Sequence, residues 1–121
     1  MNFDYILYIH IYFFLENQVP HGFPYITRNP VPTPQVEKGR NTTLICEVEG
    51  NPPPVVTWIR DSHPLNLSNS RYRVTMNDNV GRFDVFESDE SDQGRYECVA
   101  ENKIGTVVSP QFTLQVRGRS F

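Results

Sequence analysis

The sequence reads Asp92-Gln93-Gly94-Arg95-Tyr96-Glu97-Cys98 in its C-terminal third. An acidic turn, a glycine and then alternating positions predict a strand whose buried face carries the tyrosine and the cysteine. The other cysteine, Cys46, lies within the alternating run Thr42–Val48, and Trp58 follows it twelve positions later. Two cysteines on separate predicted strands, with a tryptophan between them in sequence, indicate a core shared by two β-sheets.

The order cysteine, tryptophan, tyrosine, cysteine resembles the core of an immunoglobulin sandwich. In that fold a disulfide joins the two sheets, the tryptophan packs against it, and the tyrosine two residues before the second cysteine bonds back to the backbone. We therefore predict an all-β, immunoglobulin-like fold of two antiparallel sheets pinned by one disulfide. The predicted disulfide and core residues are Cys46, Cys98, Trp58, Tyr96, Leu44 and Leu114.

Length and charge limit what the chain can be. Its 121 residues suffice for one such domain, which needs about 100 residues, and are too few for two. The net charge is −3, and basic residues are dispersed with no run longer than Arg117-Gly118-Arg119. This distribution argues against nucleic acid or an anionic membrane as the main partner. The sequence indicates no cofactor.

The cysteine pair and two glycosylation motifs point to the same compartment. A bridge across the loop from Cys46 to Cys98 contributes about 4 kcal/mol by the loop-entropy estimate, and it persists only in an oxidising environment. Asn41-Thr42-Thr43 and Asn66-Leu67-Ser68 are N-glycosylation sequons. We therefore expect an extracellular or cell-surface domain that has passed through the secretory pathway, with Asn41 and Asn66 as candidate glycosylation sites.

Three segments are expected along the chain. Residues 1–19 lie outside the sandwich pattern, residues 20–118 form the domain, and residues 119–121 begin an exit linker.

The apolar run Ile6–Leu15 is ten residues long, too short for a membrane span of about 20. It has the length of a signal-peptide core but lacks the basic residues before it and a small-residue cleavage site after it. An atypical gene start, a poor signal peptide and an anchor remain as alternatives.

Turn residues divide the domain into short predicted strands. A proline-rich approach leads into an edge strand near Tyr25-Ile26. Alternation and turns then predict further strands near 35–37, 41–48, 55–60, 64–65, 71–75, 82–87 and 94–101, with a last strand carrying Phe112, Leu114 and Val116 inward. Turns recur roughly every 8–12 residues with no helical period, as in an all-β sandwich.

A longer pattern narrows the resemblance. It runs Phe83-x-Val85-x-x-Ser88-x-x-x-Asp92-x-Gly94-x-Tyr96-x-Cys98, and Asn102-x-x-Gly105 follows it. This pattern resembles the I-set immunoglobulin domains of adhesion proteins. Its usual third apolar position is Ser88 here, so we expect that corner to pack less well.

Four segments sharpen the match: Gln18–Pro24, Val36–Lys38, Gly50–Pro54 and Glu90–Ala100. Together they resemble the second Ig domain of the LAR-type (leukocyte-common-antigen-related) receptor tyrosine phosphatases, over about residues 17–119. The resemblance implies a receptor of neurons and epithelia with Ig and fibronectin repeats outside the cell and phosphatase domains inside. It implies cell-surface or matrix proteins and glycosaminoglycan proteoglycans as partners of the parent ectodomain. The family's lysine-rich glycan loop belongs to the first Ig domain, so no glycan-binding residue carries over.

Catalytic and metal chemistry find no support in the motifs. A tyrosine phosphatase needs His-Cys-x5-Arg, but neither cysteine follows a histidine, and the positions six after them are Pro52 and Ile104. The three histidines, His10, His21 and His63, show no metal-ligand spacing. The acidic run Glu87–Asp92 lacks the spaced ligands and the glycine of a calcium loop. We expect no enzyme activity and no metal.

Charged residues suggest a salt bridge and a less favoured ligand patch. Asp92 is expected to pair with Arg71 or Arg73 across the base of the sandwich, at a cost of several kcal/mol if a buried pair is broken. Arg71, Arg73 and Arg82 are predicted to point outward and offer a sulfate-binding patch, because guanidinium pairs bidentately with such oxyanions. Asp84 on the same face favours the alternative, a mixed solvated surface.

Outward apolar residues suggest a protein-binding surface. Ile59 and Val99 point outward by alternation, beside Val107 or Val108 on the last strand, and contiguous outward aliphatics are typical of contact surfaces. Single exposed apolar residues are also normal, so an ordinary surface is the alternative. We favour a non-catalytic recognition and adhesion module of a cell-surface receptor. The other function considered is a structural I-set spacer of a muscle giant protein, cytosolic and reduced.

Overall fold

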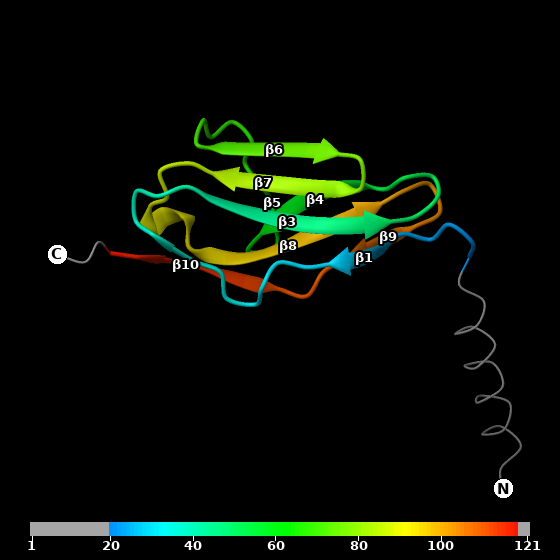
Figure 1. The fold of residues 1–121 in the computed structure, drawn as a ribbon, viewed down its shortest axis with the longest axis horizontal. Coiled ribbons are helices and arrows are strands. Elements are labelled where there is room, and N and C mark those ends of the chain that lie inside the picture. The colour runs from blue at the N-terminus through cyan, green and yellow to red at the C-terminus, as the bar shows by residue number, and fades with distance from the viewer. Residues whose placement is uncertain (1–19, 119–121) are drawn as a thin grey trace, which may run out of the picture.

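The computed structural model describes residues 20–118, and the predictions made for residues 1–19 and 119–121 lie outside that range. Two sheets face each other (Figure 1). In strand order, the four-stranded sheet holds β1 (Tyr25–Arg28), β3 (Thr42–Glu49), β7 (Val80–Val85) and β6 (Tyr72–Asn77). The six-stranded sheet holds β2 (Gln35–Glu37), β10 (Phe112–Arg117), β8 (Gly94–Glu101), β4 (Val55–Arg60) and β5 (His63–Pro64), with β9 (Thr106–Val108) also paired to β8. The predicted all-β sandwich is confirmed.

The first edge strand is split between the sheets. β1 pairs with β3 in one sheet, and β2 pairs in parallel with β10 in the other. The prolines at 30, 32 and 34 lie between them, and proline cannot donate to a ladder. The chain therefore leaves one sheet and joins the other at this point. The remaining strand pairs among the described residues are antiparallel.

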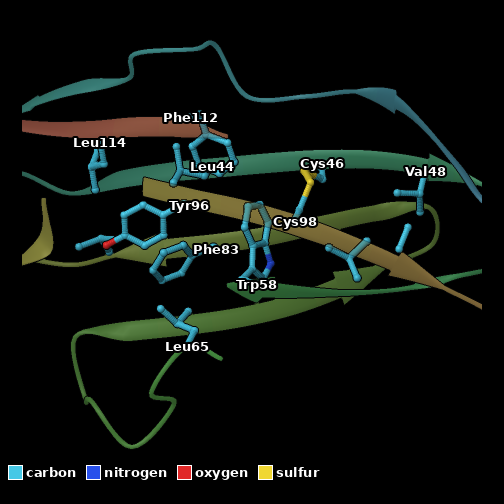
Figure 2. Close-up of a cluster of buried hydrophobic side chains, with 13 residues drawn as sticks. Leu44, Cys46, Val48, Trp58, Leu65, Phe83, Tyr96, Cys98, Phe112 and Leu114 are labelled. Carbon is cyan, nitrogen blue, oxygen red and sulfur yellow. A yellow bond between two sulfur atoms is a disulfide. The ribbon is translucent and has the colours of Figure 1, made fainter. Parts of the chain in front are cut away.

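Alternation along the central strands builds the core (Figure 2). In β3 the buried side chains are Leu44, Cys46 and Val48, and their neighbours in sequence face outward. Facing side chains come from the other sheet: Val56, Trp58, Tyr96, Cys98, Ala100, Phe112 and Leu114. Each large apolar side chain buried in this way contributes about 1.5–3 kcal/mol.

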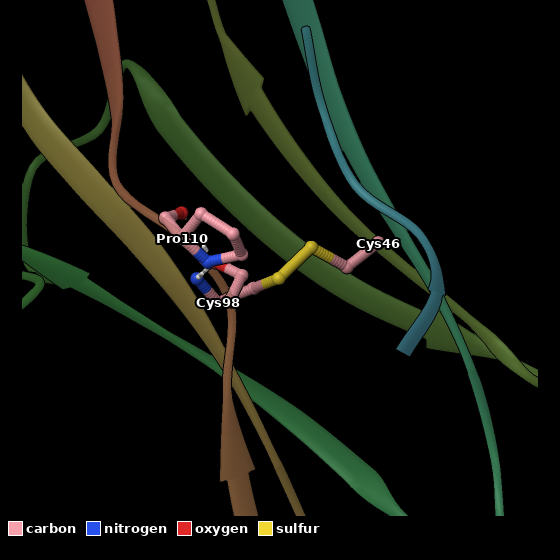
Figure 3. The surroundings of a disulfide bond; sticks show 4 residues. Cys46, Cys98 and Pro110 are labelled. Atoms are coloured by element: carbon pink, nitrogen blue, oxygen red, sulfur yellow. Dashed lines mark hydrogen bonds between the residues drawn. A yellow bond between two sulfur atoms is a disulfide. The ribbon is translucent and has the colours of Figure 1, made fainter. Parts of the chain in front are cut away.

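The disulfide joins Cys46 on β3 to Cys98 on β8, across the two sheets (Figure 3). The pairing predicted from sequence is therefore confirmed. Trp58 belongs to the same buried cluster, with its ring centroid 5.8 Å from that of Phe83. Next to the bridge, the Ser109 hydroxyl accepts a hydrogen bond from the Cys98 amide at 3.0 Å and donates to the Pro110 carbonyl at 2.9 Å.

The last predicted strand is broken at this serine. β9 ends at Val108 and β10 begins at Phe112, because Pro110 has no N–H to give to the ladder. Ser109 is buried; its amide still donates to the Cys98 carbonyl at 2.9 Å, while its hydroxyl accepts from the Cys98 amide in place of a backbone carbonyl. The break changes which residues of β9 face outward.

The corner at Ser88, where the sequence predicts looser packing, is held by polar contacts. Ser88 is fully buried, and its hydroxyl donates to the Glu37 carbonyl at 3.1 Å. Its amide donates to the Arg40 carbonyl at 2.9 Å, and its carbonyl accepts from Gly39 at 2.8 Å. Hydrogen bonds to the neighbouring turn thus hold a corner that an apolar side chain usually fills, and looser packing there stays a prediction.

The chain enters the domain at one end of the sandwich and leaves it at the opposite end (Figure 1). At the entry end, the Asn102 side-chain amide donates to the carbonyls of Gly22 at 2.8 Å and Pro52 at 2.9 Å. Phe23 lies so close to Gly105 that a Cβ there would come within 2.2 Å of the phenyl ring. One asparagine and one glycine thus fix the approach segment against the loops at that end.

Candidate functional site

The most completely paired charge is at the corner between β7 and β8. The 3-10 helix η1 (Glu90–Asp92) places Asp92 at 0% exposure under the sandwich. Its carboxylate accepts from Arg71 Nη1 at 2.7 Å and Nη2 at 2.8 Å, a bidentate pair, and from the Tyr72 hydroxyl at 2.6 Å. The Asp89 amide donates to it at 2.8 Å. Every direction around this carboxylate is occupied by the protein itself.

The electrostatics of this corner fit a structural role. Burial disfavours the charged form of Asp92, but the hydrogen bonds from Arg71 and Tyr72 outweigh burial and hold the pKa of Asp92 below its usual value. The hydrogen bond to Asp92 raises the pKa of Arg71. Burial raises the pKa of Tyr96, whose hydroxyl donates to the Asp92 carbonyl at 2.5 Å. These groups stay in one protonation state near neutral pH, so the corner holds the fold and offers no acid–base catalyst.

The two arginines considered as partners of Asp92 have separate carboxylates. Arg71 pairs with Asp92, while Arg73 Nε lies 3.5 Å from Asp84. Arg82 reaches Asp84 as well, at 3.1 Å. Asp84 is buried and also accepts a hydrogen bond from the Thr43 hydroxyl at 2.5 Å.

The predicted sulfate patch is not assembled. Arg71 lies at the β7–β8 corner, whereas Arg73 and Arg82 flank Asp84 on the outward face of β6 and β7. The Arg73 guanidinium also lies over the Phe86 ring, 5.1 Å from its centroid. Each of the three guanidinium groups is paired with a carboxylate, so this face lacks three convergent unpaired cations. The mixed surface that the sequence offered as the alternative fits these contacts.

One end of the opposite outward face is apolar. Thr57 on β4, Val99 on β8 and Val108 on β9 are direct cross-strand partners, so their side chains share one face. Val55 lies on the same face two residues before Thr57, and its exposure is 58%; that of Val108 is 47%. We call these four residues the β4–β8–β9 face. They adjoin a surface hollow of about 320 Å³ lined by Val55, Thr57, Val99, Glu101, Asn102 and Lys103.

The structure changes the membership of the predicted apolar surface. Val99 belongs to it, but Val107 does not, because Val107 pairs with Ala100 and packs against the core. Val108 is the outward residue of β9. Ile59 points outward but is half-buried, opposite Glu97 at the other end of β4. Val55 was missed, although the alternation that turns Val56 and Trp58 inward would have found it.

The two sequon asparagines occupy different settings. Asn41 directly precedes β3, and Asn66 lies in the loop that follows β5. Both are exposed. Within residues 20–118 no three histidine, cysteine or acidic side chains gather as metal ligands. Over the same range, no helix has the length and hydrophobicity that crossing a membrane requires.

Comparison with known proteins agrees with this geometry. The family described as "Immunoglobulin I-set domain" matches residues 24–116, so the chain belongs to the I-set immunoglobulin domains. It is similar to receptor-type tyrosine-protein phosphatase F of Danio rerio (44% identity) and to tyrosine-protein phosphatase Lar of Drosophila melanogaster (40%). The matches cover 86% and 85% of this chain but only 5% of each relative. The resemblance to LAR-type receptors expected from sequence is confirmed.

Solved structures give the same result. The chain is similar to the structure titled "Tandem Ig repeats of Dlar", with a TM-score of 0.75 and 39% identity over 84% of this chain and 52% of that one. A titin M3 domain matches with a TM-score of 0.71 at 24% identity, over 79% of this chain and 98% of that one, which shows a shared fold. The stretch shared with the receptor phosphatases coincides with the I-set match at residues 24–116, so the similarity is one between Ig domains.

Proposed function

We propose that this chain is a non-catalytic extracellular recognition and adhesion module of a LAR-type receptor tyrosine phosphatase, and that it binds a protein partner through the β4–β8–β9 face. Two findings support the setting: membership of the I-set family with similarity to receptor-type phosphatases, and the disulfide between Cys46 and Cys98, which needs an oxidising compartment. The exposed valines of the face carry the proposal.

The composition of the face fits a protein interface. An antiparallel sheet that faces water usually shows polar side chains, yet three valines from three adjoining strands meet here. Glu101 and Lys103 line the same hollow as Val55 and Val99. An apolar centre with a charged rim is the usual anatomy of a protein–protein interface.

A protein partner is favoured over a sulfated glycan for this domain. The candidate arginines are paired with Asp84 and Asp92, so a sulfate group would have to compete with carboxylates already in place. The apolar valines offer nothing to an oxyanion. Proteoglycan binding therefore belongs to other parts of the parent ectodomain in this proposal, while this domain contributes contacts with a cell-surface or matrix protein.

An array of extracellular ectodomains, with heparan sulfate spots included, tests the proposal. The chain is displayed as a tetramer and compared with two variants, the double change Val55→Asp/Val108→Asp and Thr75→Asp on the outward face of β6. We expect binding to at least one ectodomain, a drop of about tenfold or more for the double variant, and unchanged binding for Thr75→Asp. Binding only to heparan sulfate, or equal binding by both variants, would contradict the proposal.

The muscle-spacer alternative makes a different prediction. The similarity to titin shows the fold, and a reduced cytosolic spacer would keep Cys46 and Cys98 as thiols. Alkylation under denaturing conditions after expression in a eukaryotic secretory host decides between them. We expect both cysteines to resist alkylation until a reductant is added. Immediate alkylation of both would favour the spacer.

A further inference from the structure

The Asn66 sequon is folded into a turn of its own. The Ser68 hydroxyl donates to Asn66 Oδ1 at 2.6 Å, and the Ser68 amide donates to the same oxygen at 3.1 Å. The Asn69 amide closes the turn onto the Asn66 carbonyl at 3.4 Å. Asn66, Leu67 and Ser68 are all exposed. These contacts span at most three residues, so the turn does not depend on distant parts of the fold.

The Asn41 sequon is arranged differently. Its hydroxyl residue, Thr43, lies in β3 and donates to Asp84, not to Asn41. The Asn41 side-chain oxygen accepts from the Glu87 amide at 2.9 Å. In extended chain, residues two apart are separated by about 6.6 Å, so the threonine hydroxyl is held away from the asparagine amide. Folding therefore takes the Asn41 sequon out of the arrangement that Asn66 retains.

An apolar hollow lies beside Asn66. It measures about 200 Å³ and lies where β4 and β5 of one sheet face β6 of the other; its lining is Thr57, Trp58, Pro64, Leu65, Leu67 and Val74. The residues on both sides of Asn66 thus line it. Leu67 is 63% exposed, a large value for a leucine. Trp58, another lining residue, is 4% exposed, and its indole Nε1 has no hydrogen-bond partner among the described residues.

We propose that Asn66 carries an N-linked glycan and that this glycan covers the apolar hollow. In the transfer, Asn66 Nδ2 forms a bond to the anomeric carbon of a lipid-pyrophosphate-linked oligosaccharide. The bond from that carbon to the pyrophosphate oxygen breaks, the pyrophosphate leaves with the electron pair, and the amide loses one proton. Hydrogen bonds to Oδ1 make the amide protons more acidic, and in the structure Ser68 supplies two.

A glycan at Asn66 would determine which surfaces of the domain a partner can reach. Asn66 follows β5, which is the edge strand of its sheet, and Thr57 belongs to both the hollow and the β4–β8–β9 face. A bulky, solubilising sugar here covers an exposed leucine and limits approach from the β5 edge. It leaves Val99 and Val108, which lie on the far side of β4, open to a partner. This inference rests on the proposed extracellular function.

Site mapping tests the modification. The 121-residue chain is secreted from a eukaryotic host behind a cleavable signal, and its glycans are removed by peptide N-glycosidase in ¹⁸O-water, which converts each glycosylated asparagine to labelled aspartate. We expect label at position 66 in most chains, loss of that label in Ser68→Ala, and its retention in Asn41→Gln. A secreted, disulfide-bonded chain with unlabelled Asn66 would overturn the inference. A secreted chain with free thiols would instead contradict the proposed function.

Hydrophobic-interaction chromatography tests the covering. Leu67→Ser keeps the sequon intact, so it can be made with the glycan present or, in an Asn66→Gln background, with it absent. We expect Leu67→Ser to shorten retention clearly in the Asn66→Gln chain and hardly at all in the glycosylated chain. An equal shift in both backgrounds would show that Leu67 stays uncovered and would overturn this part. Asn41→Gln is the control and should leave the effect of Leu67→Ser unchanged.

Discussion

The outward faces of the two sheets differ in where their side chains find partners. On the four-stranded sheet, the charges of Arg73 and Arg82 meet Asp84 within the domain. On the six-stranded sheet, Val55 and Val108 meet nothing within the domain that removes them from water. The charges of the first face are paired within the domain, whereas the second face has exposed valines beside the outward charged residues Arg95, Glu97 and Glu101 of β8. Unpartnered surface, not charge content, therefore marks the candidate binding face.

The largest predicted effect comes from opening the most completely paired site. Asp92→Ala leaves Arg71 and Tyr72 without their acceptor and should lower the free energy of unfolding by about 3 kcal/mol. Glu90→Ala, which removes an exposed carboxylate on the same helix, should cost less than about 1 kcal/mol. Urea denaturation of both variants measures the difference. Equal small losses would mean that the corner contributes little to stability.

Acid should lower the free energy of unfolding, because the paired carboxylates of Asp92 and Asp84 become protonated. The hydrogen bonds that outweigh burial lower the pKa values of Asp92 and Asp84 below the unfolded value of about 3.9. Their contribution is thus fully present above that value and is lost as the pH falls through the folded pKa values. Urea midpoints between pH 7 and pH 2 should fall below about pH 4, and less so in Asp92→Asn. A midpoint independent of pH would contradict this account.

Asp84→Ala should reduce stability less than Asp92→Ala does. It also tests whether Asp84 keeps the arginines of the four-stranded sheet from binding sulfate. Arg73 and Arg82 have side-chain exposures of 62% and 47%, so they can turn to water when Asp84→Ala removes their acceptor. The loss of stability should be about 1 kcal/mol or less. The two freed cations should lengthen retention on a heparin column. Unchanged retention would show that the pairing with Asp84 is not what suppresses sulfate binding.

The smallest effect is expected for an exposed ion pair on the same sheet. Arg28 Nη1 lies 3.6 Å from Glu47, and the two side chains are 68% and 39% exposed. Arg28→Ala should change the free energy of unfolding by less than about 0.5 kcal/mol. Thermal or urea denaturation checks this. A loss as large as that of Asp92→Ala would mean that burial does not separate strong from weak pairs in this domain.

Much of the fold followed from the sequence because alternation and the spacing of Cys46, Trp58 and Cys98 are local patterns. The same patterns did not predict which valine of β9 faces outward. Counting back from Phe112, Leu114 and Val116 turns Val108 inward and Val107 outward, the reverse of what is observed. The break at Ser109-Pro110 shifts the phase by one residue, and such a shift moves every side chain to the other face.

The contacts of the candidate sites were predictable only in part. A partner for Asp92 was expected, but Arg71 and Arg73 have the same parity, and nothing local distinguishes them. β6 begins at Tyr72, so Arg71 precedes the strand and reaches the corner, while Arg73 stays on the strand beside Asp84. The contact of Phe23 with Gly105 depends on how distant loops meet, which no local pattern records.

Methyl NMR of the folded domain tests the central claim most directly. Valine methyl groups are labelled, and an ectodomain found on the array is titrated in. Binding should shift the methyl signals of Val55, Val99 and Val108 and leave those of the buried Val85 and of Val74 on β6 unchanged. Shifts confined to Val74 and its neighbours, with the three face valines unchanged, would place the partner elsewhere and contradict the account.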